Sequence, residues 1–198
     1  MNWNESWNDA RTAEAQYENA KAEMRHWQDY EVYTKFVQIA REINATPKTI
    51  LDIGCGVGQY ARLWLEAGGE WYSGCDTKHA IHHAEKLNAG VLQKTFDTEC
   101  DLTDPSYDVC MCACSLEYDQ YPPGALYNVL TDFAGSMVIL HRLRFHKNHG
   151  QFVTEPSWGG DRYIWRWNAD ELDELLAPYI VTKHPWDGGR QWTYVIEK

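Results

Sequence analysis

Residues 51–58 read Leu-Asp-Ile-Gly-Cys-Gly-Val-Gly, and this stretch decides the fold. An apolar run over 49–53, typical of a buried strand, leads directly into the glycines, and a helix is predicted over 60–67. Glycines at such a junction let the backbone turn tightly and let a ligand lie against bare main chain. Because Gln59 stands where a dinucleotide-binding loop has its third glycine, the stretch predicts a ligand-binding loop of another kind.

Strands and helices alternate downstream of this loop. We predict strands over 71–75, 90–93 and 107–114 and at the start of 135–145, and helices over 78–88, 122–134 and 168–178. Two final runs, 179–183 and 191–196, leave no room for a crossover helix and indicate a hairpin with one antiparallel strand. Near-continuous apolar strands of this kind are buried on both faces. The predicted fold is a doubly wound α/β domain, with a mostly parallel seven-stranded sheet and helices on both faces.

The segment 1–46 contains neither glycine nor proline. Apolar residues at near-helical spacing predict helix over 11–43, broken near Asp29. We therefore expect an N-terminal helical extension, 1–46, that packs on a single domain spanning 47–198.

Composition narrows the class of protein. The 198 residues are 44% hydrophobic, which is enough for a sizeable core, and the formal net charge is -11. This acidic balance argues against a non-specific nucleic-acid surface, which needs a basic face. No apolar run approaches the roughly 18 residues of a membrane helix, and residues 1–14 lack the layout of a signal peptide. The expected setting is the cytoplasm, with neither membrane nor nucleic acid as a partner.

The cysteines and aromatic residues are unusual in number. Cys110, Cys112 and Cys114 alternate along an apolar run, so they would share one face of a strand, and we interpret them as buried free thiols. No C-x-x-C spacing is present and no close pair of histidines completes a site with these cysteines, so no metal site is expected. The chain has ten Trp and twelve Tyr, whose side chains combine an apolar ring with an N–H or O–H group. We therefore expect many of them in pocket walls or in a homodimer contact.

The stretch 51–58 resembles motif I of the class I, Rossmann-like, S-adenosylmethionine (SAM)-dependent methyltransferases, and the resemblance extends over about 49–140. It implies SAM as the cofactor. In that family an acid at the position of Asp52 helps to fix the methionine ammonium, and the glycine backbone passes the methionine and ribose parts. The loop residues that this implies are Gly54, Cys55, Gly56 and Gly58.

Further acids follow the next two predicted strands. Asp76 ends the second strand, where a carboxylate can accept hydrogen bonds from both ribose hydroxyls. By the resemblance, Thr77 flanks the adenine, and Asp97 with Thr98 meets the adenine amino group. Asp101 is an alternative to Asp97, because the stretch that contains them allows a shift.

The fourth predicted strand ends at Cys114, which we place beside the cofactor because ligands bind at the carboxyl ends of strands in such sheets. Many family members carry a histidine just beyond this strand, and this sequence has Glu117, Tyr118 and Asp119 instead. Glu117 and Tyr118 are therefore catalytic candidates. The first candidate for a base is His141, which lies nearest the end of the fifth strand.

Basic residues continue beyond the fifth strand. In an extended chain Arg142, Arg144 and His146 share one face, and His141 lies on the other. One interpretation is a face that recognises a carboxylate or phosphate of the substrate. The other is a solvated strand end that offsets the acidic surface.

A loop with glycine and tryptophan follows, and then aromatic residues alternate along the chain. Trp158 lies in the loop, followed by Tyr163, Trp165 and Trp167. One interpretation is a lid over an organic substrate, with Trp158 and Tyr163 as substrate contacts. The other is packing against the N-terminal helices or a dimer partner.

The sequence as a whole predicts a methyltransferase that moves the methyl group of SAM to an O or N nucleophile of a small organic substrate, which can be anionic. A SAM-fold enzyme of another class, catalysing aminopropyl transfer or SAM cleavage, is an alternative. A non-catalytic SAM-binding module is a second alternative, because the histidine after the fourth strand is missing. A nucleic-acid methyltransferase is disfavoured by the charge and by the absence of a D/N-P-P-Y motif.

Overall fold

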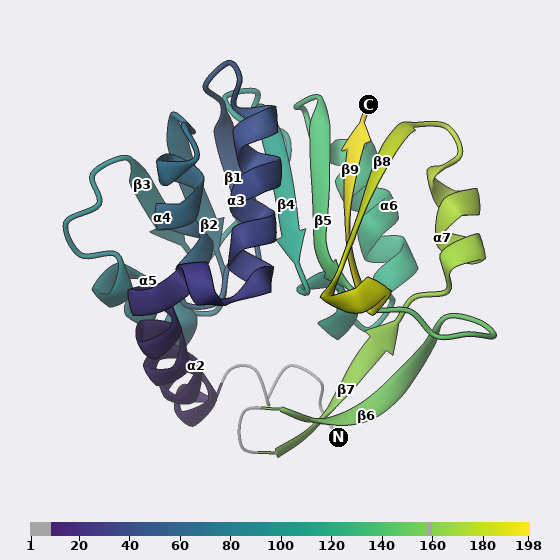
Figure 1. Ribbon diagram of the computed structural model, residues 1–198, viewed down its shortest axis with the longest axis horizontal. Coiled ribbons are helices and arrows are strands. Elements are labelled where there is room, and N and C mark those ends of the chain that lie inside the picture. Colours follow the sequence, from purple (N-terminus) through teal and green to yellow (C-terminus); the bar gives the residue numbers. More distant parts are fainter. Residues whose placement is uncertain (1–8, 158–159) are drawn as a thin grey trace.

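The computed structural model describes residues 9–157 and 160–198, and it describes the side chains of 9–155 and 162–198. Within them a seven-stranded sheet has the order β3-β2-β1-β4-β5-β9-β8. Its strands are β1 (Thr49–Ile53), β2 (Trp71–Cys75), β3 (Lys94–Asp97), β4 (Val109–Ala113), β5 (Met137–Leu143), β8 (Ile180–Trp186) and β9 (Gln191–Glu197). The first five strands pair in parallel, and β9 pairs antiparallel with both β5 and β8 (Figure 1). The predicted sheet, including its antiparallel terminal strand, is confirmed.

Helices cover both faces of this sheet, as predicted. They are α2 (Ala10–Glu23), α3 (Glu31–Ile43), α4 (Gln59–Glu66), α5 (Lys78–Leu87), α6 (Pro122–Asp132) and α7 (Ala169–Leu176), with short 3-10 turns η1 (Met24–Asp29), η2 (Leu116–Tyr118) and η3 (Asp187–Gly189). Along β4, Val109 and Met111 pack with α3 and α4, whereas Cys110 and Cys112 pack with α6 and α7. This alternation explains why the strand is apolar throughout.

Two sequence predictions about element boundaries have clear outcomes. The break near Asp29 is confirmed, because Tyr30 is extended between η1 and α3. The strand predicted over 90–93 is wrong, and β3 begins at Lys94. Gly90 has a φ of 89° and the N–H of Val91 donates to the Asn88 carbonyl, so this segment forms the turn that closes α5.

A hairpin that the sequence analysis read as a loop lies between β5 and α7. Strands β6 (Gln151–Ser157) and β7 (Gly160–Arg166) pair antiparallel and form a sheet of their own. Figure 1 shows this hairpin and α2 at the end of the molecule where the parallel strands terminate. The two elements touch, since the Arg162 guanidinium donates to the Thr12 hydroxyl over 3.0 Å. The hairpin and α2 therefore frame the carboxyl ends of the strands.

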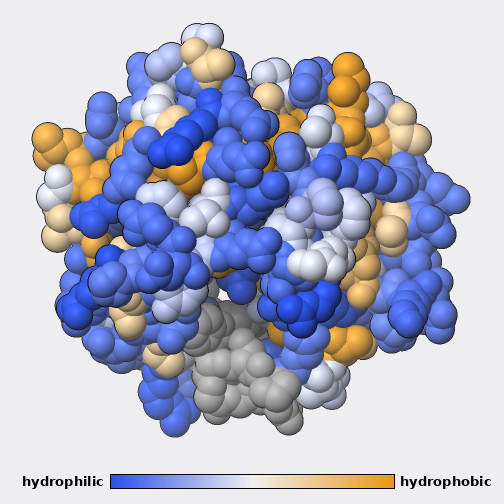
Figure 2. Space-filling view, viewed as in Figure 1, coloured by the Kyte–Doolittle hydropathy of each residue, from blue (hydrophilic) through white to orange (hydrophobic). Residues whose placement is uncertain are grey.

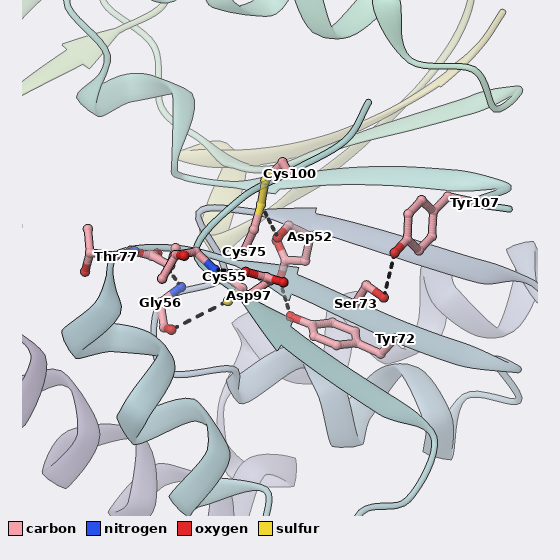
Figure 3. Close-up of a disulfide and its surroundings, with 12 residues drawn as sticks. Asp52, Cys55, Gly56, Tyr72, Ser73, Cys75, Thr77, Asp97, Cys100 and Tyr107 are labelled. Atoms are coloured by element: carbon pink, nitrogen blue, oxygen red, sulfur yellow. Dashed lines mark hydrogen bonds between the residues drawn. A yellow bond between two sulfur atoms is a disulfide. The ribbon is translucent and has the colours of Figure 1, made fainter. Parts of the chain in front are cut away.

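The cysteines divide into one pair and four free thiols. Cys75, at the end of β2, forms a disulfide with Cys100 in the loop after β3, with 5.8 Å between their Cα atoms (Figure 3). The sequence analysis did not predict this bond. Cys110, Cys112 and Cys114 are free thiols, as predicted, and the first two are buried.

The surface shown in Figure 2 is mostly hydrophilic, with hydrophobic side chains gathered in separate patches. Among the helices that the structure describes, none combines the length and apolar character needed to cross a bilayer.

Candidate cofactor and substrate site

The glycine loop between β1 and α4 has a conformation that requires its glycines. Gly54 and Gly56 have φ values of 69° and 56°, in the left-handed region. A Cβ atom on Gly54 would lie 2.4 Å from the Cβ of Ser115, so Gly54 packs directly against the residues that follow β4. The N–H groups of Gly54 and Cys55 both donate to the Cys75 carbonyl, over 2.8 and 3.1 Å. The loop is thus fixed to β2 by main-chain hydrogen bonds.

Asp76 stands directly after β2 and binds the same loop. Its Oδ2 accepts the N–H of Gly56 at 2.8 Å, and its Oδ1 accepts the N–H of Thr77 at 2.6 Å. Burial raises the pKa of the Asp76 carboxyl, against the effect of these hydrogen bonds. A carboxylate is therefore held at the point where the strands β1 and β2 end.

A cavity of about 460 Å³ opens beside this loop. Its wall is built from the glycine loop, Asp76, the ends of β4 and β5, the N-terminal helices and the hairpin. The predicted cofactor residues that line it are Gly54, Cys55, Gly56, Asp76 and Cys114. Gly58 has a different position: it caps α4, and a Cβ there would meet the ring of Phe96 at 2.7 Å.

Asp52 lies behind the loop and does not line the cavity. Its side chain is buried in the sheet, and the hydroxyl of Tyr72 donates to its Oδ2 (Figure 3). Its Oδ1 is buried without a hydrogen-bond partner among the described residues. Burial raises the pKa of this carboxyl to about 8.

The residues predicted to meet the adenine lie next to Asp76 but outside the cavity wall. The main-chain carbonyl of Asp97 accepts the N–H of Asp76 at 3.2 Å, which places the ends of β2 and β3 side by side. The Asp97 carboxylate is exposed and accepts the N–H of Thr98 at 2.6 Å. Thr77 caps α5. The alternative acid, Asp101, closes a local turn by accepting the N–H of Thr103 at 2.9 Å.

Arg142 enters the cavity from the end of β5. Its φ is 67°, and the pairing of β5 with β9 shifts register between Leu140 and Leu143. The bulge brings Arg142 and Arg144 onto the cavity wall, a position compatible with the first of the two interpretations given for this basic segment. His146, predicted to share that face, instead bonds Gln151 at 2.9 Å and does not line the cavity.

Among the described residues Arg142 forms no salt bridge, and the carboxyl of the buried Glu117 feels its charge. Its guanidinium lies among Tyr33, Tyr60, Tyr118 and Cys114. Burial acts to lower its pKa, but these four groups together outweigh burial and raise it, and its Nε is buried without a hydrogen-bond partner among the described residues. A positive charge in a cavity without a counter-charge favours binding of an anion.

Two further arginines share a single carboxylate. Glu155 of β6 accepts Nε of Arg166 at 2.8 Å and Nη1 of Arg144 at 3.2 Å. All three side chains line the cavity beside Arg142. This part of the wall therefore carries three guanidinium groups against one carboxylate.

The structure does not place the first candidate base in the cavity. His141 is fully buried on the opposite face of β5, where its Nδ1 bonds Thr193 Oγ1 at 2.7 Å and its ring stacks on Trp186. Burial lowers the pKa of His141 to about 3. Alternation along the strand explains this position, because Arg142 takes the cavity side and His141 the core side.

The two other catalytic candidates lie on the 3-10 turn η2 and differ in position. Tyr118 lines the cavity. Glu117 is buried beneath it and accepts the indole N–H of Trp167 at 3.2 Å. Burial raises the pKa of Glu117 to about 7.

The aromatic wall predicted on the segment after 158 does not form on the cavity side. Ile164 and Arg166 of β7 line the cavity. Trp165 and Trp167, on the alternate face, pack into the core with α6 and α7, and Tyr163 is half-exposed outside the cavity wall. Trp158 lies outside the described residues.

Several cavity residues were not predicted from the sequence. Helix α2 contributes Gln16, Asn19 and Glu23 to the wall, which gives the N-terminal extension a place in the site. Polar residues on a helix look the same in the sequence whether they face solvent or a ligand cavity. No local signal could therefore have identified these three residues as part of the site. Among the described residues no cluster of three or more His, Cys, Asp or Glu side chains is arranged to hold a metal ion.

Comparisons with known proteins identify a family model that matches most of the chain and solved structures of similar fold. Residues 24–179 match the family model described as "Methyltransferase domain". Magnesium protoporphyrin IX methyltransferase from Synechocystis, solved with bound SAM, has a TM-score of 0.58 at 18% identity, over 83% of this chain and 76% of that one. The 1,6-didemethyltoxoflavin-N1-methyltransferase of Burkholderia thailandensis has a TM-score of 0.59 at 15% identity, over 94% and 88%. The structure titled "DhpI-SAM-HEP complex" has a TM-score of 0.60 at 15% identity, over 93% and 96%. A search of curated proteins finds no match.

Proposed function

Since the chain belongs to the methyltransferase domain family, whose model covers residues 24–179, we propose that it transfers the methyl group of SAM to an O or N nucleophile of a small organic substrate that carries an anionic group. The observation that carries this proposal is one cavity with two different ends. The glycine loop and Asp76 line it after β1 and β2, which we take as one end, and Arg142, which forms no salt bridge among the described residues, lines it from the end of β5, which we take as the other.

The first end suits SAM on several grounds. The left-handed glycines leave main chain open to the cavity, and around a Cβ built on Gly56 nothing lies closer than 3.8 Å. The volume of about 460 Å³ falls within the usual range of small-molecule sites, roughly 300–1,000 Å³. Asp76 offers a fixed carboxylate to ribose hydroxyls. When bound, SAM would supply an electrophilic methyl group on a good leaving group, so the protein chiefly has to orient the nucleophile.

The other predicted cofactor contacts remain part of the proposal. The unpartnered Oδ1 of Asp52 is a hydrogen-bond acceptor behind the glycine loop and supports a role toward the methionine ammonium. Asp97 and Thr98 sit at the end of the neighbouring strand, within reach of a group that Asp76 holds. A cytoplasmic setting and a homodimer contact through the exposed aromatic residues also stay as proposals.

The second end supports an anionic acceptor. Binding of a carboxylate or phosphate would place a counter-charge against Arg142, with Arg144 at the margin of the same site.

Titration calorimetry with S-adenosylhomocysteine (SAH), the demethylated form of SAM, tests the cofactor half of the proposal. Binding in about the micromolar range is expected, and folded protein that binds neither SAH nor SAM would refute the proposed function. Methylthioadenosine as the product, in place of SAH, would indicate aminopropyl transfer or SAM cleavage instead.

A further inference from the structure

We propose that the oxyanion held by Arg142 is itself the methyl acceptor, so that the product is the methyl ester of a carboxylic or phosphonic acid. The inference rests on the proposed function and names its substrate class. Its basis is the combination of a guanidinium that forms no salt bridge among the described residues with a cavity wall whose described carboxylates are already engaged.

The carboxylates of the described cavity wall each have a structural task. Glu23 accepts the hydroxyl of Tyr33 at 2.6 Å and the amide of Asn19 at 3.0 Å. Glu155 holds Arg144 and Arg166, as described above. Asp76 accepts two main-chain N–H groups on the cofactor side. A carboxylate that took a proton from the substrate would weaken the hydrogen bonds that build the wall.

The remaining titratable groups near Arg142 hold their protons. Burial raises the pKa of the hydroxyls of Tyr33, Tyr60 and Tyr118 well above the ordinary value for tyrosine. It also raises the pKa of the Cys114 thiol to about 11. The two candidate bases, His141 and Glu117, are outside the cavity wall. Among the described residues that line the cavity, a hydroxyl or protonated amine held at Arg142 would therefore find no free group that can remove its proton.

An oxyanion needs no such group, because carboxylic and phosphonic acids are already ionised at neutral pH. One oxygen of the acid can accept hydrogen bonds from the Arg142 guanidinium while the other faces the glycine loop. That second oxygen attacks the methyl carbon, a C–O bond forms, and the C–S bond breaks with its electron pair passing to sulfur. One negative and one positive charge disappear together, and no proton is released when the acceptor is a carboxylate or a phosphonate dianion.

The first test measures binding without turnover. Sodium benzoate and sodium phenylphosphonate are titrated into SAH-saturated protein, and the two probes distinguish carboxylate from phosphonate recognition. At least one should bind, and Arg142→Met should weaken it at least tenfold, with Arg142→Lys intermediate because lysine lacks the planar fork. SAH affinity should stay within about twofold in both variants, which also shows that they fold. The control is Arg190→Met, since Arg190 is exposed and paired with Asp187.

The second test identifies the bond formed. Protein is incubated with methyl-tritiated SAM and matched acceptors: benzoic acid, phenylphosphonic acid, benzyl alcohol and benzylamine. Methylation of either acid supports the proposal: label in methyl benzoate is released as methanol by strong base, and monomethyl phenylphosphonate, which is stable to base, is identified by mass spectrometry. Base-stable label on the alcohol or amine overturns it.

Failure of this inference and failure of the proposed function give different results. If SAH does not bind to the wild-type chain, the proposed function fails. If SAH binds and neither benzoate nor phenylphosphonate shows Arg142-dependent binding, only the present inference fails. If Arg142→Met lowers SAH affinity more than tenfold, the guanidinium serves the cofactor carboxylate and the inference is also overturned.

Discussion

The main-chain N–H of Gly56 donates to the Oδ2 of Asp76 over 2.8 Å, and this bond joins the loop after β1 to the end of β2. The carboxylate proposed to bind the ribose therefore also stabilises the loop that would hold the methionine part. A change at Asp76 tests both tasks, and the two can be separated by comparing ligand affinity with stability.

Asp76→Ala should lower SAH affinity by roughly 1.5–3 kcal/mol, the scale of hydrogen bonds to a charged group. The stability of the free protein should change little, because losing two hydrogen bonds is offset by removing a carboxylate whose burial is unfavourable. Calorimetry and thermal melts measure the two effects. Asp132→Asn is the control, since Asp132 is exposed at the end of α6 and should leave SAH affinity unchanged. A sharp fall in stability at constant affinity would mean that Asp76 is only structural.

Gly54→Ala should destabilise the protein by roughly 2–5 kcal/mol and reduce SAH binding. The new Cβ would combine a left-handed backbone, which costs about 1–2 kcal/mol, with a collision against Ser115. Gly90→Ala is a matched control, because Gly90 also has a positive φ but no atom within 4 Å of the added Cβ. Urea denaturation should show the larger loss for Gly54→Ala. Equal losses at the two positions would contradict the close contact between the loop and β4.

The fold and the cofactor end of the site were predictable for a local reason. An apolar run in the sequence predicts each buried strand. In a parallel sheet the residues that follow such runs lie together at one edge. The glycine loop and Asp76 follow directly from that rule. The bounds of β3 were not predicted, because this edge strand, Lys94–Asp97, has few apolar residues. The hairpin was not predicted, because its two strands mix polar, aromatic and glycine residues and contain no apolar run.

The substrate end was predictable only in part. Arg142 and Arg144 were expected on one face, but the bulge that brings Arg142 into the cavity has no glycine or proline to mark it. His141 stands next to Arg142 in the same irregular segment, and alternation places it on the core side of the strand. The pairing of Glu155 with Arg144 and Arg166, and that of Cys75 with Cys100, join segments whose approach depends on the completed fold.

His141 should make the protein sensitive to acid. Its pKa falls from an ordinary 6.5 to about 3 in the folded chain, through burial first and the Arg142 charge second. The folded state then binds fewer protons than the unfolded state between these values, so its contribution is complete above pH 6.5 and is lost as pH falls toward 3. His141→Gln should lower the slope of unfolding free energy in that window by up to about 1.4 kcal/mol per pH unit. Denaturation at several pH values measures this slope, and His79→Gln, on the exposed surface of α5, is the control. An unchanged slope in His141→Gln would show that folding does not lower the pKa of His141.

The bond between Cys75 and Cys100 should stabilise the protein without being required for cofactor binding. It closes a segment with a sequence separation of 25, for which chain entropy predicts roughly 3 kcal/mol. Denatured, unreduced protein should titrate four thiols of its six cysteines, and all six after reduction. Reductant should lower the denaturation midpoint of the wild type but not that of Cys100→Ser.

SAH affinity should survive reduction, because the Cys75 carbonyl, and not its sulfur, holds the N–H groups of Gly54 and Cys55. Such a result would also reconcile the disulfide with the proposed cytoplasmic setting, where thiols are kept reduced. Six thiols in unreduced protein would show that the bond does not form.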